Sequence, residues 1–168
     1  MTNCGALGWT TDRSGYRYDC NDPQSGKPWP AMPPAFDELA TQAAERAGFP
    51  GFSPDACLIN RYEPGARMSL HQDRDEHDFG APIVSVSLGL PAIFLFGGLK
   101  RSDRPRRFRL EHADVVVWGG PARLVCWAPP RFLPPRLPAV STRRSSRCES
   151  IEPGISRFRV RRSRDAPE

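Results

Sequence analysis

The chain lacks long apolar runs and has few of the residues that build disulfide-linked or zinc-linked folds. No stretch of its 168 residues approaches the roughly 18 consecutive apolar positions that a membrane-spanning helix needs. Its five cysteines are odd in number and form no C-x-x-C pair. We therefore expect no disulfide framework, no zinc knuckle and no membrane association, and a reducing cytoplasm fits this cysteine usage. Cys57, among apolar neighbours, is expected in the core.

The net charge of +5 is concentrated near the C-terminus. Residues 124–168 hold 10 arginines, 7 prolines and 6 serines against four acidic residues, a net charge of +6, whereas residues 1–123 carry −1. A Pro/Arg/Ser-rich segment with few aliphatic side chains predicts a disordered tail without strands. Two origins stay open, a basic arm that binds phosphates or a wrong reading frame after about residue 124. We favour the wrong frame, because the composition changes abruptly.

The middle of the chain has the pattern of one helix followed by many short strands. Phe36, Leu39 and Ala43 recur at helical spacing. They predict an amphipathic helix over 35–48 that ends on a glycine. Apolar runs between Pro-Gly and Gly-Gly turns then predict strands at 56–62, 83–90, 93–96, 108–110, 115–118 and 123–127. This order indicates a mainly β domain with a flanking helix, of which the jelly roll is one form.

His71 and Asp73 form an H-x-D motif. On an extended segment, side chains two residues apart project from the same face. An imidazole nitrogen and a carboxylate oxygen held side by side are two of the three ligands in the two-His-one-carboxylate site of non-haem Fe(II) oxygenases. Alone, the motif equally describes a solvated polar loop. The motif alone does not distinguish a metal site from a loop, and the distinction depends on the surrounding sequence.

Several further motifs resemble the AlkB family of Fe(II)/2-oxoglutarate-dependent nucleic-acid repair dioxygenases. They are TNCG (2–5), LGWTT (7–11), KPWPAMP (27–33), PDACLINRY (54–62), SLHQD (69–73), APIVSVSLGLPAIF (81–94), FGGLKR (96–101) and EHADVVVWGG (111–120). The similarity covers about 124 of the 168 residues nearly without gaps. It implies a double-stranded β-helix (jelly-roll) core, which agrees with the pattern of helix and strands.

The resemblance implies an Fe(II)-dependent enzyme with 2-oxoglutarate as co-substrate. Its expected reaction is oxidative demethylation of alkylated bases, of the 1-methyladenine and 3-methylcytosine type, with release of formaldehyde, succinate and CO2. The expected partner is alkylated single- or double-stranded DNA, or RNA, and the expected state is a monomer. A dioxygenase for protein is a weaker alternative.

The resemblance also implies roles for individual residues. His71 and Asp73 would bind iron and serve catalysis, and Asn60 and Tyr62, two apart on a strand, would bind 2-oxoglutarate. The residues expected to contact substrate are Trp9, Tyr16, Tyr18, Arg74, Asp75 and Arg101. Aromatic rings hold an extruded base by stacking, a carboxylate suits a cationic methylated base, and arginines contact phosphates. Core aromatics, ordinary strand polarity and solvated arginines are the plainer alternatives.

The chain departs from the family at its end. Trp127 stands where the family has its second iron-binding His, and the closing R-x-N-x-x-x-R motif is absent, because no Asn follows Asn60. Neither His77 nor His112 is expected to replace the missing ligand. Little turnover is therefore expected, and the alternative function is a catalytically dead or frameshifted homologue that acts at most as a nucleic-acid-binding module.

Three parts are expected along the chain. Residues 1–34 form a substrate-lid segment that is N-terminally short, so Met1 is expected to be either an internal methionine or a misassigned start. Residues 35–127 form the dioxygenase β-helix core, incomplete at its C-terminus, and 128–168 form an aberrant tail. Re-sequencing codons 120–168 is predicted to reveal a frame that restores a His near position 127.

Overall fold

A computed structural model describes residues 1–63, 69–74, 76, 78–132, 149–152 and 154–159. The elements are β1 (Thr2–Gly5), β2 (Gly8–Asp12), β3 (Gly15–Asp19), α1 (Pro34–Arg46), β4 (Ala56–Ile59), β5 (Ile83–Ser87), β6 (Ala92–Phe96), β7 (Arg106–Leu110), β8 (Asp114–Trp118), the 3-10 helix η1 (Gly120–Ala122), β9 (Trp127–Phe132), β10 (Glu149–Glu152) and β11 (Ile155–Arg159). No helix in the described part is long and apolar enough to cross a membrane.

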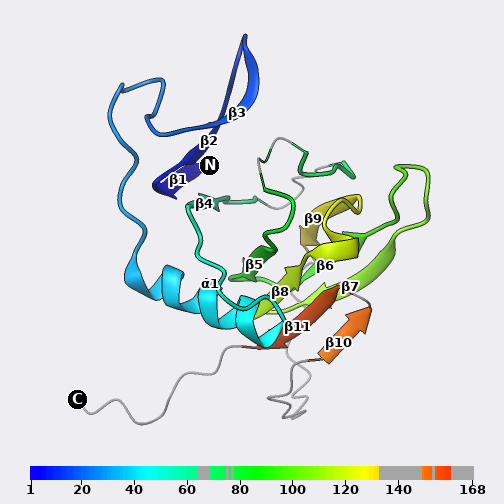
Figure 1. Ribbon diagram of the computed structural model, residues 1–168. Coiled ribbons are helices and arrows are strands. Elements are labelled where there is room, and N and C mark those ends of the chain that lie inside the picture. The colour runs from blue at the N-terminus through cyan, green and yellow to red at the C-terminus, as the bar shows by residue number, and fades with distance from the viewer. Residues whose placement is uncertain (64–68, 75, 77, 133–148, 153, 160–168) are drawn as a thin grey trace, which may run out of the picture.

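Two antiparallel sheets pack against each other, and α1 lies along the outer face of one of them (Figure 1). The larger sheet has the strand order β10-β11-β8-β5, and the smaller has the order β7-β6-β9. β1 pairs with β4, and β2 pairs with β3 as a separate hairpin. The arrangement confirms the predicted mainly β jelly-roll fold with a flanking helix.

β8 is buried along its whole length and separates two clusters of apolar side chains. Alternate side chains of a strand point to opposite faces of the sheet. Val116 and Trp118 therefore pack with Phe94 of the opposing sheet, while Val115 packs with Ala43 of α1. The strand thus fixes both the sandwich and the helix.

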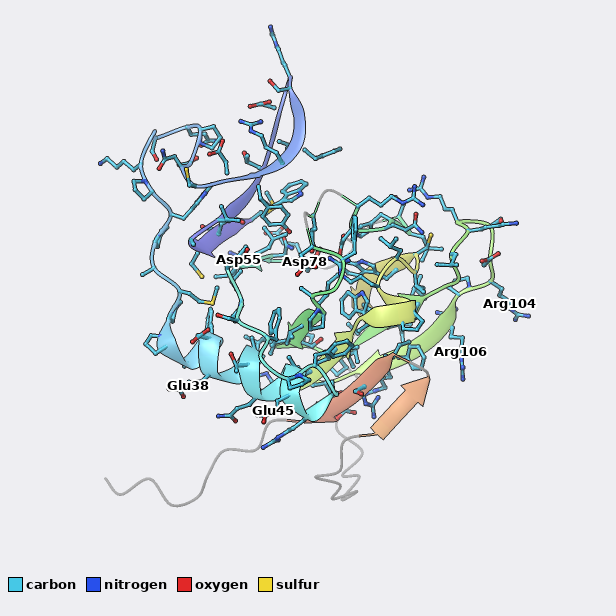
Figure 2. All side chains as sticks on the ribbon, viewed as in Figure 1. Glu38, Glu45, Asp55, Asp78, Arg104 and Arg106 are labelled. Atoms are coloured by element: carbon cyan, nitrogen blue, oxygen red, sulfur yellow. The ribbon has the colours of Figure 1, made fainter. Side chains whose placement is uncertain are left out.

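The predicted helix over 35–48 is confirmed, with its last turn ending at Arg46. Gly48 has a φ of 89°, a left-handed conformation that glycine adopts without steric cost, and the chain leaves the helix there. Ala43 and Ala44 are buried on the side facing the sheet. Glu38 and Glu45 lie on the opposite, exposed side (Figure 2).

Three strand predictions differ from the structure, and the first of them, over 83–90, ends at Ser87. The strand predicted over 56–62 ends at Ile59, so Asn60 and Tyr62 lie in the connection after β4. The prediction of a strand over 123–127 was wrong up to Cys126. Gly120, with a φ of 55°, begins a 3-10 turn instead, and the chain becomes extended only at Trp127.

The prediction that the tail contains no strands was also wrong. β11 pairs with β8 over five residues, from Ile155 opposite Trp118 to Arg159 opposite Asp114. Burial of Ile155 in the core and hydrogen bonding to the edge of β8 stabilise a segment whose composition predicts disorder. β9 carries prolines at 129 and 130, but it is an edge strand, and its register with β6 shifts between Ile93 and Leu95, where a missing N–H is tolerated. The predicted disorder of 133–148 and 160–168 lies outside the described residues.

Candidate active site

The H-x-D segment lies beside the start of β9. His71 and Trp127 form an antiparallel bridge, in which the amide of each donates to the carbonyl of the other at 2.9 and 2.8 Å. Gln72 points away and donates from its amide nitrogen to the carbonyls of Leu99, at 3.0 Å, and Leu124. These contacts hold the segment extended, so that His71 and Asp73 project to the same side, as the spacing predicted.

The two candidate ligands are close and correctly oriented for a shared cation. His71 Nδ1 lies 3.0 Å from the carbonyl oxygen of Ser69, so this nitrogen carries the proton and donates. In neutral imidazole the other nitrogen then has a free lone pair. This Nε2 lies 3.7 Å from Oδ1 of Asp73. Both atoms can reach one cation at bond lengths of about 2.1 Å.

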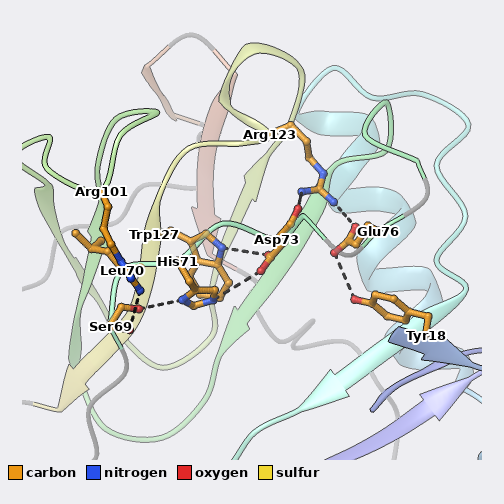
Figure 3. Close-up of polar contacts among 9 residues, drawn as sticks. All are labelled: Tyr18, Ser69, Leu70, His71, Asp73, Glu76, Arg101, Arg123 and Trp127. Carbon is orange, nitrogen blue, oxygen red and sulfur yellow. Dashed lines mark hydrogen bonds and ion pairs between the residues drawn. The ribbon is translucent and has the colours of Figure 1, made fainter. Parts of the chain in front are cut away.

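Trp127 lies beside His71, on the same side of Asp73, and contacts the second oxygen of the Asp73 carboxylate (Figure 3). Its indole N–H donates to Asp73 Oδ2 at 3.1 Å, and its ring lies 4.5 Å from that of His71. An indole nitrogen is a donor only and cannot bind a metal. The described residues supply two ligands but not a third, and among them no group of three potential metal-binding side chains is present. The residues therefore do not fit an iron bound by a full triad.

The β2–β3 hairpin presents three aromatic side chains on one face. Trp9 is opposite Tyr18, and Tyr16 lies two residues earlier on β3, so their side chains share a face. The rings of Trp9 and Tyr16 stack at 5.4 Å, and Tyr16 is 62% exposed. Asn3 of β1 fixes the base of the hairpin, because its side chain bonds both the N–H and the carbonyl of Trp9. The structure thus brings the three predicted aromatics together.

A buried arginine connects this hairpin to the H-x-D segment. The side chain of Arg123 is only 2% exposed and forms an ion pair with Glu76. It also donates to the carbonyls of Ala81, at 3.0 Å, and Asp73, at 3.4 Å. The other carboxylate oxygen of Glu76 accepts the hydroxyl of Tyr18 at 3.3 Å. A continuous polar chain therefore runs from the hairpin to Asp73.

The environment keeps the Tyr18 hydroxyl protonated. Burial, followed by the negative charges of Glu76 and Asp73, raises the pKa of Tyr18 far above its usual value. Burial also raises the pKa of Glu76, against the lowering effect of the Arg123 guanidinium. Tyr18 is thus a permanent donor near neutral pH, and Glu76 is its acceptor.

The predicted 2-oxoglutarate residues are not arranged as the sequence suggested. Asn60 is exposed and Tyr62 is half-buried, and burial raises the pKa of the Tyr62 hydroxyl. Trp118, whose ring is 5.2 Å from that of Trp127, has a buried indole N–H without an acceptor among the described residues. An unsatisfied buried N–H costs about 1–3 kcal/mol.

The remaining predicted residues lie at the edge of the site or outside the described part. Arg101 donates to the Leu70 carbonyl at 2.7 Å and to the Ser69 hydroxyl at 3.2 Å, so it braces the strand that carries His71. Arg74 is exposed. His112 accepts the amide N–H of Gly89 at 3.0 Å through its Nδ1. Asp75 and His77 lie outside the described residues.

Sequence reasoning missed Glu76 and Arg123 as site residues. Charged residues in a turn-rich segment usually face solvent, and nothing in the local pattern indicated burial of Glu76. The available signal was the position of Arg123 between Ala122 and Leu124, in a run of small and apolar side chains. An arginine in such a run needs an acidic partner if it is buried.

A jelly roll with an H-x-D pair beside β9 has the fold and two of the three ligand types of a two-His-one-carboxylate oxygenase site. A family model described as "2OG-Fe(II) oxygenase superfamily" matches residues 1–147. The chain belongs to this superfamily.

Similar proteins carry dioxygenase and demethylase names. The chain is 69% identical over 124 residues to "Alpha-ketoglutarate-dependent dioxygenase AlkB" of Escherichia coli (strain K12), which covers 74% of this chain and 57% of that protein. It is 33% identical over 137 residues to "tRNA demethylase abh1" of Schizosaccharomyces pombe (strain 972 / ATCC 24843), covering 79% and 44%. The solved structure described as "The structure of OsALKBH1" superimposes with a TM-score of 0.68 at 28% identity, covering 94% of this chain and 75% of that chain. The chain thus spans less than two thirds of the length of these two curated relatives.

Proposed function

We propose that the chain catalyses oxidative demethylation of alkylated bases in nucleic acid, with Fe(II) as cofactor and O2 and 2-oxoglutarate as co-substrates. The observation that carries the proposal is the His71–Asp73 pair, in which the Nε2 lone pair lies next to a carboxylate, and which the contacts of Arg123 and Glu76 connect to Tyr18 of the aromatic hairpin. The names of the bacterial relatives, which are alpha-ketoglutarate-dependent dioxygenases, support the same reaction class. Formaldehyde, succinate and CO2 are its products.

The hairpin and the arginines supply the substrate side of the proposal. Trp9 and Tyr16 offer stacked rings to an unpaired base. Arg74 is exposed and available to a phosphate. Asp75 is proposed to face the positive charge of a methylated base, because only the damaged base carries that charge. Single- or double-stranded DNA and RNA all present such bases, and a monomer in a reducing cytoplasm is proposed.

Trp127 favours a second candidate, a nucleic-acid-binding module without turnover. The indole N–H already occupies one oxygen of Asp73. Bound iron would supply the oxidising chemistry, but the described residues offer it two ligands instead of three. The aromatic hairpin and Arg74 would bind nucleic acid in either case.

Formaldehyde release separates the two candidates. The purified chain is incubated with Fe(II), 2-oxoglutarate and a 1-methyladenine oligonucleotide, and formaldehyde and oligonucleotide binding are both measured. Demethylation predicts formaldehyde that depends on 2-oxoglutarate and on the methyl group, and a His71→Ala variant should abolish it. Oligonucleotide binding with no formaldehyde, at saturating Fe(II), would contradict demethylation and leave the binding module.

A further inference from the structure

The β2–β3 hairpin is held to the rest of the molecule by few strand contacts. β2 and β3 pair only with each other among the described strands, and the hairpin projects away from the sandwich (Figure 1). Its base is fixed through Asn3. The end of β3 is held by the indole N–H of Trp29, which donates to the carbonyl of Asp19 at 2.8 Å, and β3 reaches the loop after His71 through the hydroxyl of Tyr18. Tyr18 is therefore the contact that joins the hairpin to the H-x-D segment.

Glu76 is the acceptor for Tyr18 and is itself fixed by a buried cation. Arg123 is held by the carbonyls of Ala81 and Asp73 as well as by Glu76. A planar guanidinium bonded in three directions leaves its carboxylate partner little freedom. Figure 3 shows the resulting order Tyr18, Glu76, Arg123, Asp73. The hairpin is thus joined to the main chain of the H-x-D segment itself.

We propose that Glu76 is a positioning residue that fixes the β2–β3 hairpin beside Asp73 through the Tyr18 hydroxyl. The role of the hairpin as a substrate lid rests on the proposed function, but its attachment does not. Because coupling between two sites is reciprocal, a ligand that orders the Asp73 segment would also order the hairpin.

Hydrogen exchange of the purified full-length chain tests the attachment without metal or nucleic acid. Tyr18→Phe removes the hydroxyl that donates to Glu76. Tyr16→Phe is the control, because it removes a hydroxyl from the same strand, but from an exposed side chain outside the polar chain. We expect Tyr18→Phe to accelerate exchange over residues 8–19 by roughly five- to twentyfold. Tyr16→Phe should match the wild type, and α1 and β8 should be unchanged in both variants.

A matched pair at Glu76 separates attachment from general stability. Glu76→Ala and Glu76→Gln both leave Arg123 without its anion, but only glutamine keeps an acceptor oxygen for Tyr18. Glu76→Gln should therefore retain more protection over residues 8–19 than Glu76→Ala, and adding Tyr18→Phe to Glu76→Ala should change nothing further. The proposal is overturned if Tyr18→Phe exchanges like Tyr16→Phe, or if Tyr18→Phe still accelerates exchange in the Glu76→Ala background. Formaldehyde release is not used, so an inactive chain still gives a decisive result.

Discussion

At the scale of single residues, Trp127 contributes both to the polar site around Asp73 and to the apolar core. Its N–H satisfies Asp73, while its ring packs against Phe94 and Trp118. A histidine at this position would lose the ring contacts that Trp127 makes with Phe94 and Trp118, and it would add an imidazole nitrogen with a lone pair. The same backbone therefore supports either a hydrophobic contact or a third ligand.

Trp127→His should create a metal site at some cost in stability. With Co(II) as the probe, we expect the Kd to fall at least about tenfold relative to the wild type, because a third protein ligand is gained. Trp127→Phe is the control, since it also removes the N–H from Asp73 but adds no ligand. Isothermal titration of the three proteins measures the effect. Equal Co(II) affinity of the His and Phe variants would rule out a ligand position at 127.

Cys57 should react slowly with alkylating agents at neutral pH. It lies directly opposite Cys4 in the β1–β4 ladder, and burial, followed by the Cys4 thiol, raises its pKa to about 11. The thiolate is the reactive form, so its alkylation rate should rise about tenfold per pH unit until about pH 11. Because its pKa is raised on folding, the stability it contributes is lost as the pH rises through that value.

Peptide mapping after timed iodoacetamide treatment measures this rate. Cys20, which is exposed, provides the comparison within the same molecule and should be modified first at pH 8. A Cys57 rate that levels off below pH 9 would contradict the shift.

At the scale of elements, β11 completes the sheet that carries β8. Ile155 is 2% exposed and packs in the main core cluster. Ile155→Ala should lower the free energy of unfolding by about 2–4 kcal/mol, the usual range for such a truncation in a core. Ser156→Ala, the next position on the strand, should change it by less than about 0.5 kcal/mol. Urea denaturation compares the two, and similar small losses would mean that β11 does not pack in solution as described.

The elements also show which parts of the fold were predictable from local pattern. The helix was predicted because Leu39 and Ala43 repeat at the spacing that buries one helical face. β8 was predicted because its four apolar residues stand between turns. β11 could not be found in this way, since Ile155 is the only aliphatic side chain of its strand, and the pairing partner lies far away in sequence.

At the scale of the whole molecule, the site combines segments whose proximity no local pattern contains. His71 and Asp73 were predicted as a pair because spacing alone places them on one face. The ion pair of Arg123 with Glu76 joins positions 47 residues apart. Its existence depends on the 3-10 turn after β8, which the sequence suggested would be a strand. The candidate ligands were therefore predictable, whereas the groups that orient the hairpin were not.

The bridge between His71 and Trp127 is made by main-chain atoms on both sides. No side-chain atom of residue 127 takes part in this bridge. The backbone can therefore hold position 127 next to His71 whichever side chain stands there. A substitution at 127 alone would leave this strand pairing in place, but the closing R-x-N-x-x-x-R motif would still be absent. An inactive site of this kind would differ from an active one in its side chains, while the pairing of its main-chain segments would be the same.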